Sequence, residues 1–337
     1  MVYVPIIKWK KGERKALSML SSGVKKQIVP FFDIPVSTKS LQDICNDIKE
    51  DWKNEKFFFY LEPEWYDEEA DDYETAAYSF FKSFFNTLNN PQAIPVFDLT
   101  NIHAIRNWPN DYTQEYAIII REKEMSLVSD ELNTILEKKN KSVIYIIIDL
   151  KYVDEDSIYS KQAALKAVLL DLDNPDAFKS IIVASNSFPS DVAKTEIDQV
   201  ALFRRYELII DETSRKLSKK LNFNYVFSDY GPTDLADIPF VLGMSPNFKI
   251  KYTAMDQYCY LKGKSVKRGG LDIDNVRLSS KILVSSSFYQ GPNFSWADGE
   301  IFKIASGNKN NPGNLTTWVS YNFNHHISYI VFQLIGK

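Results

Sequence analysis

The sequence predicts a closed (β/α)8 barrel, and three observations lead to that prediction. Short apolar runs alternate with amphipathic helical patterns along residues 1–231. There are eight such runs, spaced by roughly thirty residues, and eight parallel strands close a barrel. Several runs carry a carboxylate at their end, as YIIIDLK (145–151) does at Asp149. Carboxylates are tolerated there because the carboxyl ends of barrel strands open onto one solvated rim.

Each expected strand is apolar on both faces, as a strand covered by a barrel core and a helix layer must be. In chain order the expected strands are 3–9, 27–35, 56–63, 93–101, 115–122, 142–150, 179–189 and 224–231.

Helical periodicity follows most of these strands. We expect Thr38 to cap the helix after the second strand and Ser129 to cap the helix after the fifth. The expected helices cover 13–22, 41–52, 74–88, 129–140, 160–172 and 200–221. An open, doubly wound sheet is the alternative, but the segment IKWKKGER after the first strand lacks the GxGxxG turn typical of that fold.

The pattern changes after residue 231. Residues 248–270 alternate with a period of two and predict a hairpin, 276–287 predict a helix, and 324–335 predict a final buried or amphipathic segment. No Pro/Gly/Ser-rich linker precedes this part. We therefore expect a single domain over 1–337, in which residues 232–337 elaborate the eighth unit and help to close the barrel.

Composition indicates a reduced cytoplasmic protein. The 337 residues are 45% hydrophobic and 25% charged, with a net charge of -4, so no overall attraction to nucleic acid is expected. Two cysteines, Cys45 and Cys259, do not suggest a disulfide framework. No apolar window is long enough for a membrane span, and the apolar run at the N-terminus is too short for a signal peptide.

Polar residues end the predicted strands and should meet at the rim. Such a rim can hold a phosphate through Lys8 and Arg121, or Mg²⁺ through Asp33, Asp149 and Asp229. The alternative is that these residues only cap helices or begin solvated loops. The full set is Lys8, Asp33, Glu62, Asp98, Arg121, Asp149, Ser185 and Asp229.

Other candidates come from later motifs. His325 and His326 suit general acid–base chemistry, or they are satisfied structural histidines. Arg204 and Glu207 can pair on one helix face as a solvated ion pair. The alternative is that Arg204 or Arg205 reaches an anion at the rim or pairs with a rim acid. The basic stretch KGKSVKRGG (262–270) can bind phosphates or remain a solvated loop, and it lacks the P-loop pattern.

Several ordered motifs resemble the phage-related family called beta protein, or Beta family protein. They are YVPIIKWKKGERKAL, RRYELI, FSDYG, FSWADGEIF and TTWVSYNFNHHISYIVFQL. The resemblance runs nearly end to end and implies a cytoplasmic protein of phage–host conflict, in a family without an established activity. The motif residues are Lys8, Lys10, Glu13, Arg205, Glu207, Asp229, Tyr230, Trp296, Asp298, Trp318, His325 and His326. Ala297 stands where the motif has glycine, which puts a tight turn in doubt.

Three functions compete. The first is binding or processing of a phosphate-containing small molecule, nucleotide-like, with Asp149, Asp229, His325 or His326 as catalytic groups. Its ligand-binding residues would be Lys8, Lys10, Asp33, Glu62, Asp98, Arg121, Arg205, Glu207, Tyr230 and Trp318. The second is a non-catalytic protein that recognises a phage or host protein or partners a nuclease. The third, nucleic-acid binding through Lys262–Arg268, is opposed by the acidic charge balance.

Overall fold

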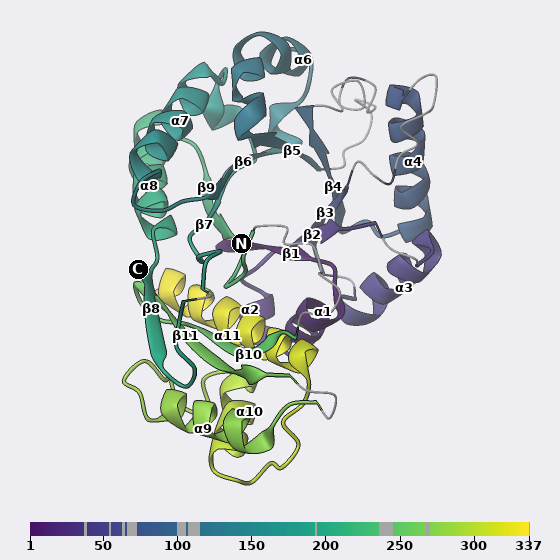
Figure 1. Ribbon diagram of the computed structural model, residues 1–337. Coiled ribbons are helices and arrows are strands. Elements are labelled where there is room, and N and C mark those ends of the chain that lie inside the picture. The colour runs from purple at the N-terminus through teal and green to yellow at the C-terminus, as the bar shows by residue number, and fades with distance from the viewer. Residues whose placement is uncertain are drawn as a thin grey trace. The chain divides into compact units, whose positions relative to one another are not determined.

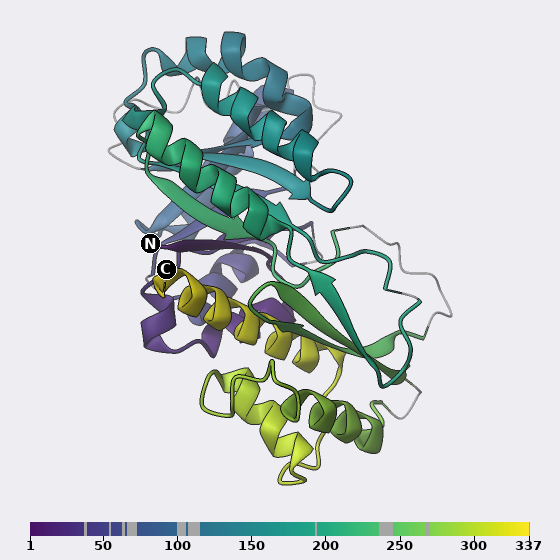
Figure 2. The same ribbon diagram turned by 90° about the vertical axis from the view of Figure 1, so that its left-hand side faces the viewer.

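The computed structural model divides the chain into two compact units (Figures 1 and 2). The barrel unit comprises residues 1–9, 29–186 and 206–230, and the second unit comprises 10–28, 187–205 and 231–337. The structure describes residues 1–36, 39–53, 55–62, 65, 73–99, 106, 115–192, 194–235, 245–266 and 270–336. Whether the chain behaves as the single expected domain stays a prediction.

The barrel unit is a closed ring of eight parallel strands, which Figure 1 shows in a view along the ring. The (β/α)8 prediction is confirmed, and the open-sheet alternative is wrong because β1 pairs with both β2 and β9. Each strand lies inside an apolar run identified in the sequence, except that β6 extends past its predicted end at residue 150 to Tyr152. The strands are β1 (Tyr3–Lys8), β2 (Phe31–Ile34), β3 (Phe57–Leu61), β4 (Ala93–Asp98), β5 (Tyr116–Arg121), β6 (Ile144–Tyr152), β7 (Ser180–Asn186) and β9 (Tyr225–Asp229).

The pairing register decides which side chains face the barrel interior. Phe32 packs edge-on against Trp52, which follows a surrounding helix, so Phe32 faces outward. Successive strand residues point to opposite faces, and Asp33 therefore faces inward. Lys8 and Tyr60 are the register partners of Asp33, so they share its direction. Because register partners on neighbouring strands point to the same face, this comparison identifies the inward-facing residues of every barrel strand. We call these residues the inward set.

Helices cover the outside of the barrel. They are α3 (Leu41–Asp51), α4 (Tyr73–Leu88), α6 (Asn133–Leu136), α7 (Ile158–Asp171) and α8 (Glu207–Leu221). α3 turns Ile44, Cys45 and Ile48 inward, as its periodicity predicts.

Three local predictions on these helices need correction or lie outside the described residues. Ser40 caps α3 by accepting a hydrogen bond from the Asp43 N–H, whereas Thr38 lies outside the described residues. Ser129 lies within a π-helical turn (Val128–Leu132) and is not a cap. The helix expected over 200–221 begins only at Glu207, because Val200–Arg204 forms a strand, β8.

The second unit is built on an antiparallel sheet of order β10–β11–β8. β10 (Asn247–Thr253) and β11 (Gln257–Ser265) form the predicted hairpin. Its helices are α1 (Lys11–Ser18), α2 (Ser22–Lys25), α9 (Ile273–Val284), α10 (Trp296–Ala305) and α11 (Leu315–Ile335). One face of the hairpin packs with α9, α10 and α11 into an apolar core (Figure 2). None of the helices in the described residues combines the length and the apolarity that a membrane crossing needs.

Candidate functional site at the carboxyl rim of the barrel

Charged side chains of the inward set gather where the barrel strands end. Lys8 lies beside Asp33 in the register of β1 and β2, and Arg121 lies beside Asp149 in that of β5 and β6. Because these positions end their strands, the apolar interior stops below them and the polar groups meet at the rim.

The Asp33 carboxyl group holds its proton more tightly than an ordinary aspartate does. Burial and, to a smaller extent, the nearby Glu62 carboxylate raise the pKa of Asp33 to about 6. Lys151, Lys8 and Arg121 all act to lower this pKa, but they do not outweigh burial. A carboxyl group with a pKa near 6 can both accept and donate a proton at physiological pH.

Arg121 is held in place by Asp98 and Tyr60. Its Nη1 lies 3.0 Å from Asp98 Oδ2, and the Tyr60 hydroxyl donates to the same oxygen at 2.7 Å. The guanidinium also lies over the Tyr60 ring, 4.7 Å from its centroid. Burial, followed by the Asp98 charge, raises the pKa of the Tyr60 hydroxyl, so this hydroxyl remains a donor. The Arg121 charge is thus matched by Asp98 before any ligand arrives.

Asp149, Lys151 and Tyr230 form a second polar cluster at the rim. The Tyr230 hydroxyl donates to Asp149 Oδ2 at 2.6 Å, and Lys151 Nζ donates to the Tyr230 hydroxyl at 3.0 Å. Lys151 Nζ also lies 3.2 Å from Asp149 Oδ2. Asp149 is fully buried, whereas Lys151 keeps 46% of its side chain exposed. The lysine can therefore serve both the buried acid and an incoming anion.

The backbone at Lys151 is strained. Its φ of 54° lies in the left-handed region, which residues other than glycine rarely adopt. In this conformation the Lys151 N–H donates to Asp149 Oδ1 at 3.0 Å, and the β6–β7 register is interrupted between Asp149 and Tyr152. Such strain is often retained where it positions a functional group.

Lys151 and Tyr60 were not among the residues predicted from the sequence. A signal for Lys151 was present, because it follows the acid of YIIIDLK by two residues and returns to the same strand face. Tyr60 was hidden inside the apolar run FFFYL, where only the strand register shows that it faces the rim.

Asp229 does not join the inward set, which corrects the expectation that it meets the other strand-end residues at the rim. It lies in register with Pro5 and Ser185, one residue out of phase with Ser228 and Val4. Its carboxylate accepts a hydrogen bond from the Tyr3 hydroxyl at 2.5 Å and is fully buried on the outward face. Ser185 faces outward for the same reason. The catalytic role of Asp229 stays a prediction without a place at the rim.

The Mg²⁺ set expected from the sequence does not assemble. Asp33 and Asp149 face inward, whereas Asp229 faces outward. Within the described ranges, no three His, Cys, Asp or Glu side chains are arranged to hold a metal ion.

Five other predicted residues lie outside this rim cluster. Lys10 is an exposed residue directly before α1. Arg205 belongs to the second unit, where its Nη1 donates to the carbonyl of Ala254 at 3.0 Å. Glu207 is buried in the first turn of α8, and Arg204 ends strand β8, so the expected ion pair on one helix face is wrong. Trp318 lies in the core of the second unit.

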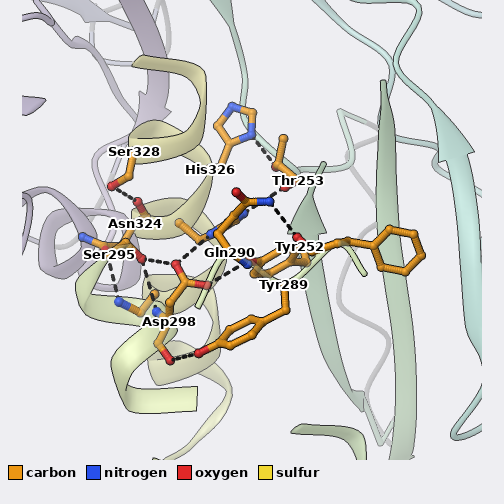
Figure 3. A network of polar contacts seen from close by, with 12 residues as sticks. Tyr252, Thr253, Tyr289, Gln290, Ser295, Asp298, Asn324, His326 and Ser328 are labelled. Atoms are coloured by element: carbon orange, nitrogen blue, oxygen red, sulfur yellow. Dashed lines mark hydrogen bonds and ion pairs between the residues drawn. The ribbon is translucent and has the colours of Figure 1, made fainter. Parts of the chain in front are cut away.

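His325 and His326 belong to a buried polar network of the second unit, shown in Figure 3. His325 Nδ1 lies 2.9 Å from Asp298 Oδ2, and its Nε2 lies 2.9 Å from the Thr253 carbonyl oxygen. His326 Nδ1 lies 2.7 Å from the Thr253 hydroxyl. These contacts favour the structural reading of the two histidines, and their catalytic role stays a prediction.

Asp298 is the anionic centre of this network. It accepts hydrogen bonds from Tyr252 at 2.8 Å and Ser295 at 2.5 Å. Burial would raise the pKa of Asp298, but His325 and these hydroxyls outweigh burial and hold it below its usual range. Ala297 and Asp298 lie in the first turn of α10, so no tight turn is needed where the motif has glycine.

The basic stretch 262–270 lies partly outside the described residues, which omit 267–269. The proposed contact of this stretch with nucleic acid stays a prediction.

A model of one protein family, described as Beta protein, matches residues 3–332. The chain belongs to the Beta protein family. This match confirms the resemblance drawn from the dispersed motifs. A search of curated proteins found no match to this Beta protein family member.

Two solved structures with low similarity complete the comparison. One is a D-psicose 3-epimerase with D-tagatose from Clostridium cellulolyticum H10, at 10% identity and a TM-score of 0.37, covering 68% of this chain and 84% of that one. The other is a GH5-4 broad-specificity endoglucanase from an uncultured bacterium, at 11% identity and a TM-score of 0.29, covering 69% and 75%.

Proposed function

We propose that this Beta protein family member binds a small phosphate-containing molecule, nucleotide-like, at the carboxyl rim of its barrel, as a cytoplasmic protein of phage–host conflict. The observation that carries the proposal is the Asp33 carboxyl group, to which burial and the Glu62 charge give a pKa of about 6 although Lys151, Lys8 and Arg121 lie near it. A carboxyl group in that environment destabilises the fold when ionised, so a role in the site explains its presence.

Lys8 and Lys151 are the cations that we assign to the phosphate. Arg121 is already matched by Asp98 at 3.0 Å, and its guanidinium is fixed over Tyr60. Lysine side chains are long and mobile, and each presents a point charge that phosphate oxygens can approach from several directions.

The carboxylates of the rim complement this phosphate site. Asp33 and Glu62 can accept hydrogen bonds from hydroxyl groups, such as those of a ribose. A ligand that carries both hydroxyl and phosphate groups would therefore satisfy both signs of charge at the rim. If a reaction follows binding, Asp33 is the group that we expect to accept or donate the proton.

A thermal-shift screen tests the proposal. The intact chain is heated with inorganic phosphate, nucleosides and nucleotides, each with Mg²⁺ and with a chelator. A ligand at a hundred times its Kd stabilises the fold by about 2.7 kcal/mol, which raises the unfolding midpoint by a few degrees. We expect nucleotides to do so, and Lys8→Met and Lys151→Met to remove the shift.

Lys216→Met is the matched control, because Lys216 is an exposed lysine of α8 that pairs with Glu212. It should leave the ligand shift unchanged. Absence of any shift with all phosphate compounds, or a shift that the rim variants retain, would refute the proposal.

An interaction protein is the second candidate, and strand β8 favours it. In the described part of the second unit, β8 pairs only with β11, so it is an edge strand of this sheet. Val200 and Leu202 expose 37% and 46% of their surface there. Exposed apolar edge strands are sites of strand addition. A protein partner that binds the intact chain and is released by Leu202→Lys, with rim variants unaffected, would support this function.

A further inference from the structure

Three lysines lie on one face of the β10–β11 hairpin in the second unit. Lys249 is the register partner of Lys262 across the two strands, and Lys251 follows Lys249 on the same face. Cross-strand partners lie about 5 Å apart at their Cβ atoms, so Lys249 and Lys262 place two positive charges on neighbouring positions, and Lys262 Nζ donates to the Thr195 carbonyl at 3.2 Å. We call Lys249, Lys251 and Lys262 the lysine face.

Lys251 is set on aromatic rings instead of beside an acid. Its Nζ lies 4.2 Å from the centroid of the Phe188 ring. Tyr260 is its register partner on β11, and Phe188 and Tyr260 belong to one buried cluster. Among the described residues no carboxylate forms an ion pair with Lys249 or Lys251, and Asp234 attracts Lys251 only from a distance.

This environment weakens the hold of Lys251 on its proton. Burial, followed by the Lys249 charge, lowers the pKa of Lys251 to about 8 against the attraction of Asp234. At pH 7.5 an amine of this kind is neutral on the order of a hundredfold more often than an ordinary lysine. Desolvation and a neighbouring cation are the two ways by which proteins make a lysine nucleophilic.

We propose that Lys251 is a reactive amine that forms an imine with a small aldehyde or ketone bearing an anionic group. The neutral amine attacks the carbonyl carbon and forms a C–N bond. The carbonyl oxygen then leaves as water together with the two amine protons, and a C=N bond remains. No oxidant or reductant is needed. Lys249 and Lys262 supply the positive charge that attracts the anionic group of the compound. This site is independent of the function proposed for the barrel rim.

Reductive trapping on the intact chain tests this inference. The protein is treated with glyoxylate and cyanoborohydride at pH 7.5, and the modified peptides are quantified by mass spectrometry over time. Lys281, an exposed lysine of α9 in the same unit, is the internal reference. We expect Lys251 to react at least about tenfold faster than Lys281, and the ratio to fall to about one in urea.

Two comparisons separate the parts of the proposal. With acetaldehyde, which reports the amine alone, Lys249→Met should slow the reaction of Lys251 at pH 7.5 several-fold and leave it unchanged at pH 10, where the amine is neutral in either protein. Acetaldehyde, which carries no anion, should show a smaller preference for Lys251 than glyoxylate does. Equal rates for Lys251 and Lys281 in the folded protein would overturn the proposal, and equal preferences for the two aldehydes would remove the anionic group from it.

Discussion

Asp33 is the rim residue whose ionisation is expected to lower the stability of the fold. Its pKa is raised to about 6, so the folded state binds a proton more tightly than the unfolded state does. The resulting stability is fully present below the unfolded-state pKa near 4 and is lost as the pH rises through about 6. Above pH 6 the ionised carboxylate lowers the stability of the protein.

Replacing Asp33 with asparagine removes this cost. We expect Asp33→Asn to stabilise the fold by about 1–2 kcal/mol at pH 7.5 and to have little effect at pH 4. Urea unfolding at the two pH values measures the difference. A variant that is less stable than the wild type at pH 7.5 would show that the ionised carboxylate has a structural partner.

Lys151 tests the link between strain and function at a single residue. Alanine at this position keeps the left-handed strain, whereas glycine relieves it, so Lys151→Gly should be more stable than Lys151→Ala by about 1 kcal/mol. Both variants should lose the phosphate-dependent thermal shift, because both lack the amine. Chemical denaturation measures the stability of the two variants. Equal stabilities would contradict the assignment of backbone strain to Lys151.

At the scale of elements, α1 and α11 of the second unit approach closely at a glycine. A Cβ atom on Gly12 would lie 2.7 Å from Cγ1 of Val319 and 3.2 Å from the Thr316 carbonyl oxygen. Both contacts are shorter than van der Waals separation, and the carbonyl cannot move without disturbing α11.

Gly12→Ala should therefore destabilise the protein by about 1–3 kcal/mol, as overpacked sites do. Gly23→Ala in α2 is the matched control, since its Cβ would meet nothing closer than 3.9 Å. That variant should be neutral or slightly stabilising, because alanine favours helix more than glycine does. Thermal unfolding midpoints of the two variants test this prediction. Similar midpoints would exclude close helix packing at Gly12.

At the scale of the whole barrel, the two ends carry carboxylates with opposite behaviour. Glu115 precedes β5 at the amino end and pairs with Lys56 at 2.6 Å and with Lys179, while Tyr145 donates to it at 3.0 Å. Burial would raise the pKa of Glu115, but these partners outweigh burial and lower it. Its contribution to stability is therefore present above the unfolded-state pKa and is lost as the pH falls through the lower folded-state value.

Glu115→Gln should consequently destabilise the barrel by about 1–2 kcal/mol at pH 7, and the loss should shrink toward pH 3. Lys216→Met, which removes an exposed ion pair, should change stability by less than about 0.5 kcal/mol. Unfolding measured across pH would contradict this assignment if Glu115→Gln cost as much at pH 3 as at pH 7. Stabilising pairs at the amino end and a costly carboxyl group at the carboxyl end fit the usual division of a barrel into a stability face and a functional face.

The sequence predicts the eight strands well because each is a continuous apolar run bounded by polar turns. It predicts that acids reach the rim, but whether an acid faces the barrel interior or the helix layer changes with a shift of one residue along the strand. Asp149 and Asp229 both follow apolar runs, and only the register shows that one faces inward and the other outward. β8 was missed because its alternating pattern runs directly into the helix that begins at Glu207.

Calorimetric titration of the intact chain with the nucleotide that gives the largest thermal shift tests the central claim most directly. Wild type and Lys216→Met should bind it with the same Kd. Lys8→Met and Lys151→Met should each bind at least about tenfold more weakly, the equivalent of about 1.4 kcal/mol. Equal affinity in all four proteins would place the ligand elsewhere and contradict a binding site at the rim.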